Sequence, residues 1–482
     1  MPEPLSTKVV KSGLWVFALR ILNRGLGFIR TIILARLLAP EDFGILGIAM
    51  LSISTLETFS HTGFHTTLIQ KKDNIESYLN TAWTVSALRG TMLFVILFFS
   101  APMIARFFNS SAATSVIRVI ALFTLFSGLQ NISILFFQKE LEFHKQFIYE
   151  FAATLANLIV AIPLAFLLRN VWALVWGGLA SSVVRLILSY TLHPYRPLIQ
   201  LNRQKLKELW HFGKWVLGST ILVFLVTQGD DIFVGKVLGL TALGLYQLSY
   251  TLSNLPATEI THVVSRVTFP AYSKLQDDLP RVRSAYLKVL QFISFLSFPL
   301  AGAIFIFLPD FVSIFLGDKW TPMVPAAQVL VMAGLLRSIA ATTGPIFHAL
   351  GKPKIDTNWQ IIRFLVLLTL IYPLTLQWNI LGTSIAVFIS ILAATIGFTA
   401  KTIKLIKFDV SSLVRPICLP LVKTTLAALP IFMFLRNASF VNWWYFVLLL
   451  GLYLALYLFL TYLADRFLNY GLSKIIKEIL CY

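Results

Sequence analysis

Long apolar stretches separated by short polar connectors repeat along the whole sequence. A helix that crosses a bilayer needs roughly 20 apolar residues, and the chain contains such a stretch many times over. The connectors carry turn-forming residues, as in Ala39-Pro40-Glu41-Asp42 and Gly351-Lys352-Pro353. This pattern predicts an all-α polytopic membrane protein with about fourteen transmembrane helices. We place them at residues 13–38, 44–69, 79–106, 113–137, 146–168, 172–192, 212–238, 242–269, 285–308, 324–350, 357–377, 380–400, 416–436 and 443–465.

The composition agrees with a membrane protein. The 482 residues are 57% hydrophobic and 13% charged, whereas soluble domains carry about 25% charged residues. The two cysteines, Cys418 and Cys481, do not predict a structural disulfide. No small-residue cleavage site follows a short apolar core at the N-terminus, so we expect the first apolar stretch to remain as a helix.

Lysine and arginine are distributed unevenly over the connectors. Those on one side of the predicted spans hold 23 of these residues, and those on the other side hold 6. Because cytoplasmic loops are enriched in Lys and Arg, we expect a cytoplasmic (inner) membrane protein with both termini in the cytoplasm. The formal net charge of +19 is spread over short loops and helices without an RNA-binding signature. It therefore predicts contacts with anionic membrane lipids and no nucleic-acid partner.

Several sequence features recur at a spacing of 200 residues. Gly13 and Trp15 recur as Gly213 and Trp215, and Gly44 recurs as Gly244. Six predicted spans separate the copies, so both would have the same orientation. Parallel repeats of this kind occur in transporters that work by alternating access. We therefore expect two pseudo-symmetric six-helix lobes and two further helices with a cytoplasmic tail, at residues 1–209, 210–409 and 410–482.

Basic residues inside the predicted spans are the main indication of function. Eleven of the 40 Lys and Arg residues lie there, against five acidic residues, when five bases at span ends are counted with the connectors: Arg36, Arg106, Lys236, Lys288 and Arg436. An arginine at the bilayer centre costs about 2.5–3.5 kcal/mol on insertion scales and normally faces protein or a watery cavity. The surplus predicts a cavity that binds an anion, although snorkelling of an arginine to the interface or pairing with a local acid stays open. The candidate cavity residues are Arg20, Arg24, Arg89, Arg185, Arg337 and Arg363.

Acidic residues at the same depth are candidates for gating. Asp230 occupies the repeat position of Arg30, and Asp231 follows it. An ion pair of Arg30 with Asp230 or Asp231 would close the periplasmic side. A structural pair within one lobe is the alternative.

Glu57, His61 and His65 are spaced four apart and share one face of the second predicted span. This arrangement fits a packing stripe, a proton relay or a metal site, and packing is the simplest interpretation. Glu57, His61 and the acidic Glu259 are our candidates for ion coupling, with H⁺ or Na⁺ as the ion. We expect no resident cofactor and no metal.

Nine short motifs between the first and tenth spans occur together in this order: Leu34-Ala35-Arg36-Leu37-Leu38, Asp42-Phe43-Gly44, Gln70-Lys71-Lys72, Gln138-Lys139-Glu140-Leu141-Glu142-Phe143, Phe212-Gly213-Lys214-Trp215, Arg266-Val267-Thr268-Phe269-Pro270-Ala271-Tyr272, Gln276-Asp277-Asp278, Gly317-Asp318-Lys319-Trp320 and Gly334-Leu335-Leu336-Arg337-Ser338. In these motifs the sequence resembles the Wzx-type polysaccharide/O-antigen flippases, which belong to the multidrug/oligosaccharidyl-lipid/polysaccharide (MOP) exporter superfamily. The resemblance is greatest to the colanic-acid and teichuronic-acid exporter branch. The resemblance implies two six-helix lobes around a central cavity. It also implies a substrate of undecaprenyl-diphosphate-linked oligosaccharide repeat units, turned from the cytoplasmic to the periplasmic leaflet, and partners among the polysaccharide polymerase and chain-length machinery.

Two other classes of protein fit the sequence less well. A drug or metabolite antiporter of the same superfamily would favour acids in its cavity, whereas bases outnumber acids here. A membrane enzyme of glycan assembly would need catalytic residues on a sizeable loop, and the longest expected periplasmic loop, residues 309–323, has no cluster of them. No Gly-x-x-x-x-Gly-Lys motif for ATP is present. We therefore expect a transporter and not an enzyme.

Overall fold

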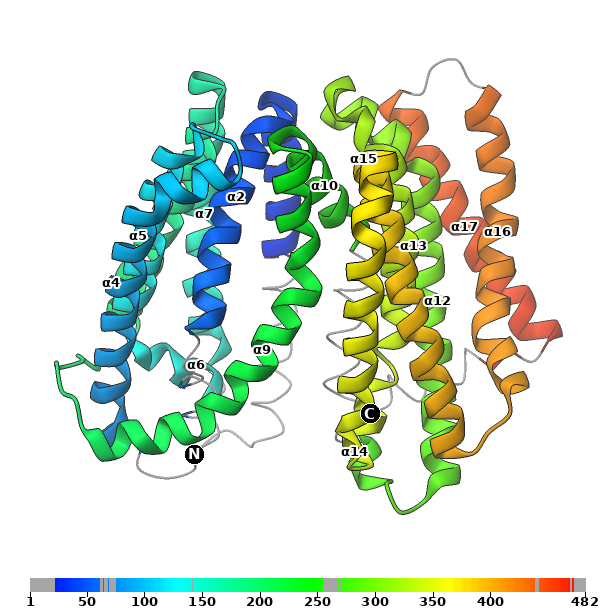
Figure 1. Cartoon of the computed structure of the whole chain (residues 1–482). Helices are drawn as coiled ribbons and strands as arrows, with labels where there is room; N and C mark the ends of the chain where they lie inside the picture. Colours follow the sequence, from blue (N-terminus) through cyan, green and yellow to red (C-terminus); the bar gives the residue numbers. More distant parts are fainter. Residues whose placement is uncertain are drawn as a thin grey trace. The chain divides into compact units, whose positions relative to one another are not determined.

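The structure is a computed structural model of the chain. It describes residues 22–60, 64, 68, 75–140, 142–254, 268, 271–437, 442–468 and 470–471. Every regular element within these ranges is a helix. The prediction of an all-α polytopic protein is therefore confirmed (Figure 1).

The chain divides into two compact units, Met1–Gly244 (unit 1) and Leu245–Tyr482 (unit 2). This division differs from the predicted lobe boundary at residue 209. Packing in space and repetition in sequence need not divide a chain at the same residue. The repeat stays a prediction.

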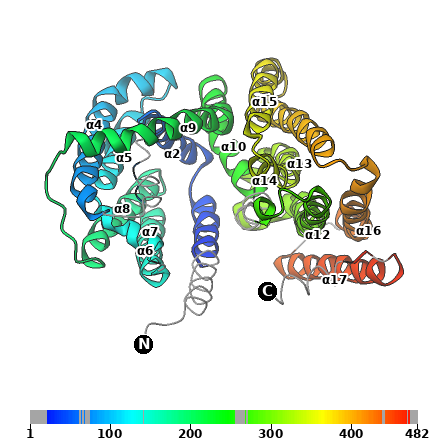
Figure 2. The same cartoon turned by 90° about the horizontal axis from the view of Figure 1, so that it is seen from below.

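Unit 1 begins with a helical segment at residues 22–37. Within unit 1, α4 packs along α5, and α7 packs along α8. Helix α2 packs against both α5 and α9, as Figures 1 and 2 show. The last helix, α10, starts in unit 1 and continues into unit 2. The elements are α2 (Pro40–Phe59), α4 (Glu76–Phe107), α5 (Ala113–Leu129), η1 (Ile132–Ile134), α6 (Leu135–Lys139), α7 (Phe143–Leu168), α8 (Trp172–Thr191), α9 (Arg203–Val237) and α10 (Leu240–Ser253).

The predicted span at residues 113–137 is broken in the structure. The long helix α5 ends at Leu129, and Asn131 takes up an extended conformation. The Asn131 side chain accepts a hydrogen bond from the Ser133 backbone N–H at 3.1 Å and donates one to the Tyr195 carbonyl at 2.7 Å. These bonds satisfy the backbone where one helix stops and the next turn starts. Hydropathy alone could not locate this break.

Unit 2 contains the remaining helices. Helix α12 contacts α13, α16 and α17, and α13 packs against α15. The expected loop at 309–323 is instead largely helical, because α12 runs on through a π-helical turn and a 3₁₀ turn. The elements are α12 (Leu279–Phe311), η2 (Val312–Leu316), η3 (Asp318–Met323), α13 (Val324–Ala340), α14 (Gly344–Ala349), α15 (Pro353–Ile406), η4 (Val410–Leu413), α16 (Val414–Asn437) and α17 (Trp443–Phe467).

Helix α15 is a hairpin of two helices and not one continuous rod. Its backbone leaves the helical conformation at Trp378 and Asn379, where the φ of Asn379 is +52°. The hydroxyls of Thr375 and Thr383, on opposite sides of that point, lie 2.8 Å apart. Fifty-four residues of straight helix would extend about 80 Å, far beyond a hydrocarbon core of about 30 Å. The two limbs match the predicted spans 357–377 and 380–400.

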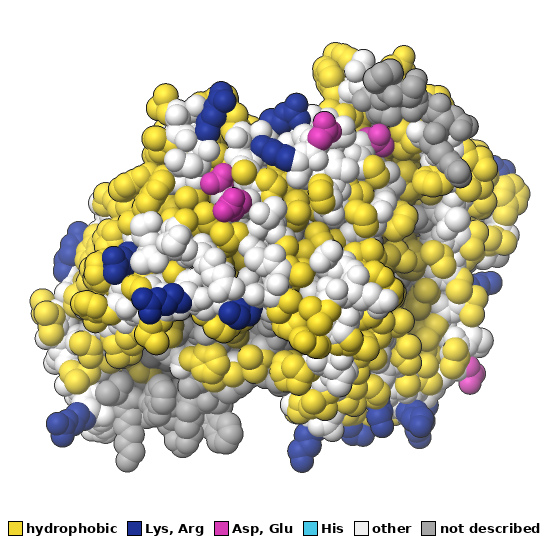
Figure 3. All heavy atoms as spheres, turned by 45° about the horizontal axis from the view of Figure 1, so that its top comes forward, with side chains coloured by type: hydrophobic (Ala, Val, Ile, Leu, Met, Phe, Trp, Pro, Cys, Tyr) yellow, Lys and Arg dark blue, Asp and Glu magenta, His cyan; other side chains and the backbone are white. Residues whose placement is uncertain are grey.

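Nine helices of the described residues are long and apolar enough to cross a membrane, with α15 counted as one. Helix α5 is a shorter apolar helix. On the face of the molecule drawn in Figure 3, hydrophobic side chains cover much of the surface and charged side chains lie in small, separate groups. This surface suits a lipid environment.

Two glycines that the repeat relates to each other meet at the start of α2 and α10. A Cβ added to Gly44 would lie 2.0 Å from the carbonyl oxygen of Leu240, and one added to Gly244 would lie 1.9 Å from that of Pro40. Leu240 is also the residue 200 positions after Pro40, so the contact is reciprocal. Small residues allow membrane helices to approach this closely. This crossing is consistent with the predicted duplication.

Candidate functional site

The first candidate site is a cavity of about 580 Å³ in unit 2, here called the unit 2 cavity. Two of the predicted arginines, Arg337 from α13 and Arg363 from α15, line it together. Its other polar lining residues are Thr343, His348, Asp356, Gln360 and Thr395.

Arg337 is held in place by the last turn of α10 and by the residue that follows it. Its Nη1 donates to Asn254 Oδ1 at 2.8 Å, and its guanidinium carbon lies 4.7 Å from the centre of the Tyr250 ring. Its buried Nε has no hydrogen-bond partner in the part of the chain that the structure describes. A guanidinium has five N–H donors, so Arg337 retains donor capacity after bonding to Asn254. It is oriented for a ligand with several acceptor oxygens.

Arg363 belongs to a polar face of α15. Asp356, Gln360 and Arg363 are four and three residues apart, a spacing that brings side chains to one side of a helix. All three line the unit 2 cavity. Asp356 Oδ2 lies 3.6 Å from His348 Nε2 of α14. The cavity therefore has a cationic part, formed by the arginines, and a part with mixed polar groups.

A second, smaller cavity of about 230 Å³ lies in unit 1, here called the unit 1 cavity. Glu57 from α2 and Arg89 from α4 line it with Gln130 and Asn131. Arg89 Nε donates to Ser60 Oγ, and its Nη2 donates to the Glu57 carbonyl, both at 3.0 Å. The guanidinium thus satisfies a carbonyl in the last turn of α2, where a helix favours positive charge. Arg89 has a structural role beside any role toward a ligand.

Close packing of α4 on α5 positions Arg89. A Cβ added to Gly90 would lie 2.6 Å from the Thr124 carbonyl oxygen, and one added to Gly128 would lie 2.6 Å from the Ser86 carbonyl oxygen. These two glycines and Thr124 also line the unit 1 cavity. The small residues that let the helices approach therefore also shape the cavity.

The other predicted arginines of unit 1 are placed differently. Arg185 of α8 is half-buried, with its guanidinium carbon 5.9 Å from the centre of the Tyr149 ring of α7. Tyr149 donates its hydroxyl to Gln130 at 2.9 Å, and Gln130 lines the unit 1 cavity. Arg24 has an exposed side chain in the helical segment 22–37. Both arginines belong to unit 1, and a cavity that they share with Arg337 and Arg363 of unit 2 stays a prediction.

The gating candidates have other contacts in this structure. Arg30 Nη1 donates to Asn157 Oδ1 of α7 at 2.8 Å. Asp230 of α9 is buried, and its Oδ1 accepts a hydrogen bond from the Asp231 backbone N–H at 3.1 Å. An ion pair between Arg30 and either aspartate is not among the contacts of the described residues. The gating pair stays a prediction.

Arg20, His61, His65 and Glu259 lie outside the residues that the structure describes. The alternatives for the Glu57–His61–His65 face therefore stay open. Among the described residues, no group of three or more His, Cys, Asp and Glu is arranged to bind a metal.

The polar residues that accompany the arginines of unit 2 were not among the predicted site residues. Asp356 and Gln360 lie at the start of a predicted span, where polar residues usually belong to the interface. Their spacing to Arg363 was a usable signal, because it predicts a shared helix face. The approach of His348 to Asp356 depends on how α14 and α15 pack, and no sequence pattern indicates it.

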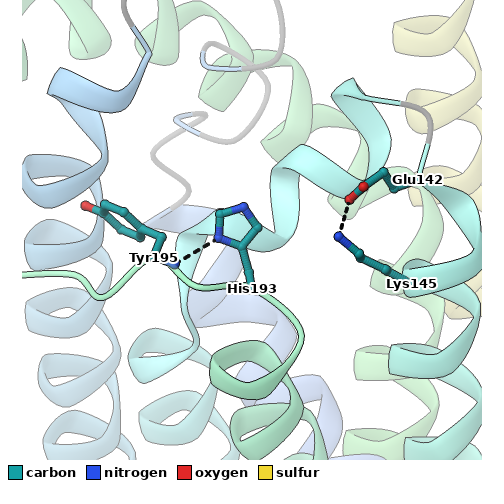
Figure 4. A network of polar contacts seen from close by, with 4 residues as sticks. All are labelled: Glu142, Lys145, His193 and Tyr195. Atoms are coloured by element: carbon teal, nitrogen blue, oxygen red, sulfur yellow. Dashed lines mark hydrogen bonds and ion pairs between the residues drawn. The ribbon is translucent and has the colours of Figure 1, made fainter. Parts of the chain in front are cut away.

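A polar network follows α8 on the side predicted to face the cytoplasm. Figure 4 shows His193 and Tyr195 after α8, and the ion pair of Glu142 with Lys145 at 2.7 Å near the start of α7. His193 Nδ1 accepts a hydrogen bond from the Tyr195 backbone N–H at 3.2 Å. Burial lowers the pKa of His193 below its ordinary 6.5, and the charge of Lys145 lowers it further. The neutral imidazole that this bond requires is therefore favoured.

The family model of polysaccharide biosynthesis proteins matches residues 33–325. The chain belongs to this polysaccharide biosynthesis family. The resemblance to Wzx-type flippases of the MOP superfamily is thereby confirmed.

Members and structural relatives of the polysaccharide biosynthesis family agree with this assignment. The lipopolysaccharide biosynthesis protein WzxC of Escherichia coli (strain K12) is 26% identical over 362 residues, which cover 74% of this chain and 73% of WzxC. The teichuronic acid biosynthesis protein TuaB of Bacillus subtilis (strain 168) is 27% identical over 303 residues, 62% of each chain. The solved structure of the lipid II flippase MurJ in an inward closed conformation matches with a TM-score of 0.73 at 16% identity, covering 95% of this chain and 100% of that one. At this identity the match shows the fold alone.

Proposed function

We propose that this member of the polysaccharide biosynthesis family flips undecaprenyl-diphosphate-linked oligosaccharide repeat units from the cytoplasmic to the periplasmic leaflet of the inner membrane, for export of a surface polysaccharide. The observation that supports it best is the pair Arg337 and Arg363, which come from separate elements and line one cavity within membrane-spanning helices. The relatives WzxC and TuaB are named for lipopolysaccharide and teichuronic acid biosynthesis.

Arginine suits the diphosphate for a physical reason. Its planar fork donates two parallel, charge-assisted hydrogen bonds to a phosphate, and it stays protonated at all physiological pH values. A diphosphate that enters hydrocarbon loses its hydration shell, and a cavity with oriented guanidinium groups replaces it. The polyprenyl tail never needs to leave the bilayer. Only the head group therefore requires a polar path, and alternating access would supply it.

The test is the fate of the lipid-linked repeat units in a strain that lacks the gene. Lipid-linked oligosaccharide should accumulate in the cytoplasmic leaflet. Wild-type protein should relieve this accumulation, and the Arg337→Ala/Arg363→Ala variant should not. Arg118→Ala is the matched control, because Arg118 is an exposed arginine of α5 whose guanidinium carbon lies 5.2 Å from the centre of the Phe98 ring. It should export normally.

Normal surface polysaccharide in the deletion strain, with no paralogue that substitutes, would contradict the proposal. A drug or metabolite antiporter of the same superfamily would then be the better assignment. Full activity of the double arginine variant would leave flipping intact but would remove the unit 2 cavity from the mechanism.

A further inference from the structure

The unit 2 cavity is not lined by cations alone. Along α15 the lining changes from Arg363 to Gln360 and then to Asp356. The first and last of these lie seven residues apart, which is about 10 Å along a helix. A cavity that bound only a phosphate would gain nothing from a carboxylate at this distance, because like charges repel. The lining therefore indicates a ligand with an anionic part and a second, uncharged polar part.

The other polar groups of the cavity keep hydrogen-bonding capacity. His348 and Asp356 are separated by 3.6 Å, which is too long for a hydrogen bond. Their side chains are 49% and 30% exposed, so a ligand in the cavity can reach both. The Gln360 amide has no hydrogen-bond partner among the residues that the structure describes. A carboxylate accepts from hydroxyls, and an amide both donates and accepts.

We infer that Asp356 and Gln360 bind hydroxyl groups of the sugar that is joined to the diphosphate, while Arg337 and Arg363 bind the diphosphate itself. This inference rests on the proposed function and extends it to two positions that distinguish a glycosylated lipid from a bare one. His348 of α14 closes the same part of the cavity and supplies a further donor to the sugar.

The polar groups of Asp356 and Gln360 would allow the site to distinguish the glycosylated lipid from the lipid diphosphate without a sugar. A site built to hydrogen-bond a hydroxyl leaves its own groups unpaired when the hydroxyl is absent, and this costs affinity for the simpler ligand. The loss is larger when the unpaired group is charged, as Asp356 is. The cavity should therefore bind the glycosylated lipid more tightly than the same lipid diphosphate without its sugar.

The test compares two lipids on the full-length protein in nanodiscs. One is the undecaprenyl-diphosphate-linked oligosaccharide extracted from the deletion strain, and the other is undecaprenyl diphosphate. Wild-type protein should bind the first about tenfold more tightly than the second. Asp356→Asn/Gln360→Ala should abolish this preference and bind undecaprenyl diphosphate at least as tightly as the wild type does, because it lacks the carboxylate that repels the diphosphate. Retained binding of that lipid also demonstrates that the variant is folded. Arg337→Ala/Arg363→Ala should weaken the binding of both lipids.

Three outcomes would overturn the inference. Wild-type protein with equal affinity for the two lipids would leave the proposed function standing but would remove sugar recognition from the site. A double variant of Asp356 and Gln360 that keeps the preference would have the same consequence for these two residues. Wild-type protein that binds neither lipid would contradict the proposed function itself, and the inference with it.

Discussion

Basic side chains in the described membrane-spanning helices differ in their surroundings. Arg337 lines a cavity with part of its guanidinium unbonded, whereas Arg89 donates to the end of α2. Lys423 of α16 is buried, with its Nζ 4.1 Å from the centre of the Tyr470 ring and 5.4 Å from that of the Tyr457 ring. An aromatic face attracts a cation. A position deep in the membrane is therefore not sufficient evidence that an arginine or lysine binds the substrate.

The role of Arg89 at the end of α2 can be measured as stability. Arg89→Ala should lower the free energy of unfolding by about 1–3 kcal/mol, because the partly buried Glu57 carbonyl and Ser60 hydroxyl lose their donor. Arg89→Lys should recover only part of this, since a lysine cannot reproduce the two-donor geometry. Thermal unfolding in detergent tests this, with Arg118→Ala as the control. Equal unfolding temperatures for Arg89→Ala and Arg118→Ala would contradict it.

His193 should make stability depend on pH. Its pKa in the folded state is below the 6.5 of the free side chain, so the unfolded chain binds the proton more tightly. Its contribution is complete above about pH 6.5 and is lost as the pH falls through the folded-state pKa. The unfolding temperature of the wild type should therefore fall more between about pH 7.5 and about pH 5.5 than that of His193→Asn, which cannot titrate. The same fall in both proteins would show that other groups dominate.

Single positions control how the helices cross. Gly44 and Gly244 allow the start of α2 to approach the start of α10, and Gly90 and Gly128 allow the middle of α4 to approach the C-terminal end of α5. The α15 hairpin reverses at Asn379. Each contact involves backbone atoms, which cannot move aside as a long side chain can. The helix crossings are therefore the least tolerant points of the fold.

Replacing a glycine at the crossing of α2 and α10 with a larger residue should strongly lower the stability of the protein. Gly44→Val or Gly244→Val should destabilise the protein by about 1–3 kcal/mol or more, because the new side chain meets a carbonyl oxygen. Gly229→Ala is the control, since nothing lies within 4 Å of the added Cβ. Alanine also favours a helix over glycine. Unfolding temperature and export should both fall in the two valine variants and not in the control, and wild-type stability of Gly44→Val would refute the close contact.

At the scale of the whole molecule, the charge bias of the connectors makes a topological prediction. Both termini should face the cytoplasm, because 23 basic residues lie in the connectors of one side and 6 in those of the other. The hairpin form of α15 fits this scheme, since it returns the chain to the side on which the helix began.

Reporter fusions test the orientation directly. A fluorescent protein fused after Tyr482 or after Lys352 should fluoresce, and alkaline phosphatase fused at these positions should be inactive. Alkaline phosphatase fused after Lys319 should be active, because it would lie in the periplasm. The opposite pattern at Lys352 and Lys319 would reverse the predicted topology.

The sequence was sufficient for properties that depend on one segment at a time. Apolar length predicted long helices that the structure describes, including the two limbs of α15, since each span must satisfy its own backbone hydrogen bonds within the bilayer. Apolar length did not predict the break at Asn131, where the backbone N–H donates to the Ser189 hydroxyl and the side chain donates to the Tyr195 carbonyl. Those partners lie some sixty residues away, so no local pattern contains them.

For the candidate site, too, the sequence predicted some features and the tertiary structure decided others. The sequence by itself determined the family, the helical class and the arginines at membrane depth, because composition and order carry that information. Only the tertiary structure decided that Arg337 and Arg363 line one cavity with Asp356 and Gln360, and that Arg89 supports α2. A cavity is formed by side chains from elements far apart in the chain, and their packing determines which residues meet.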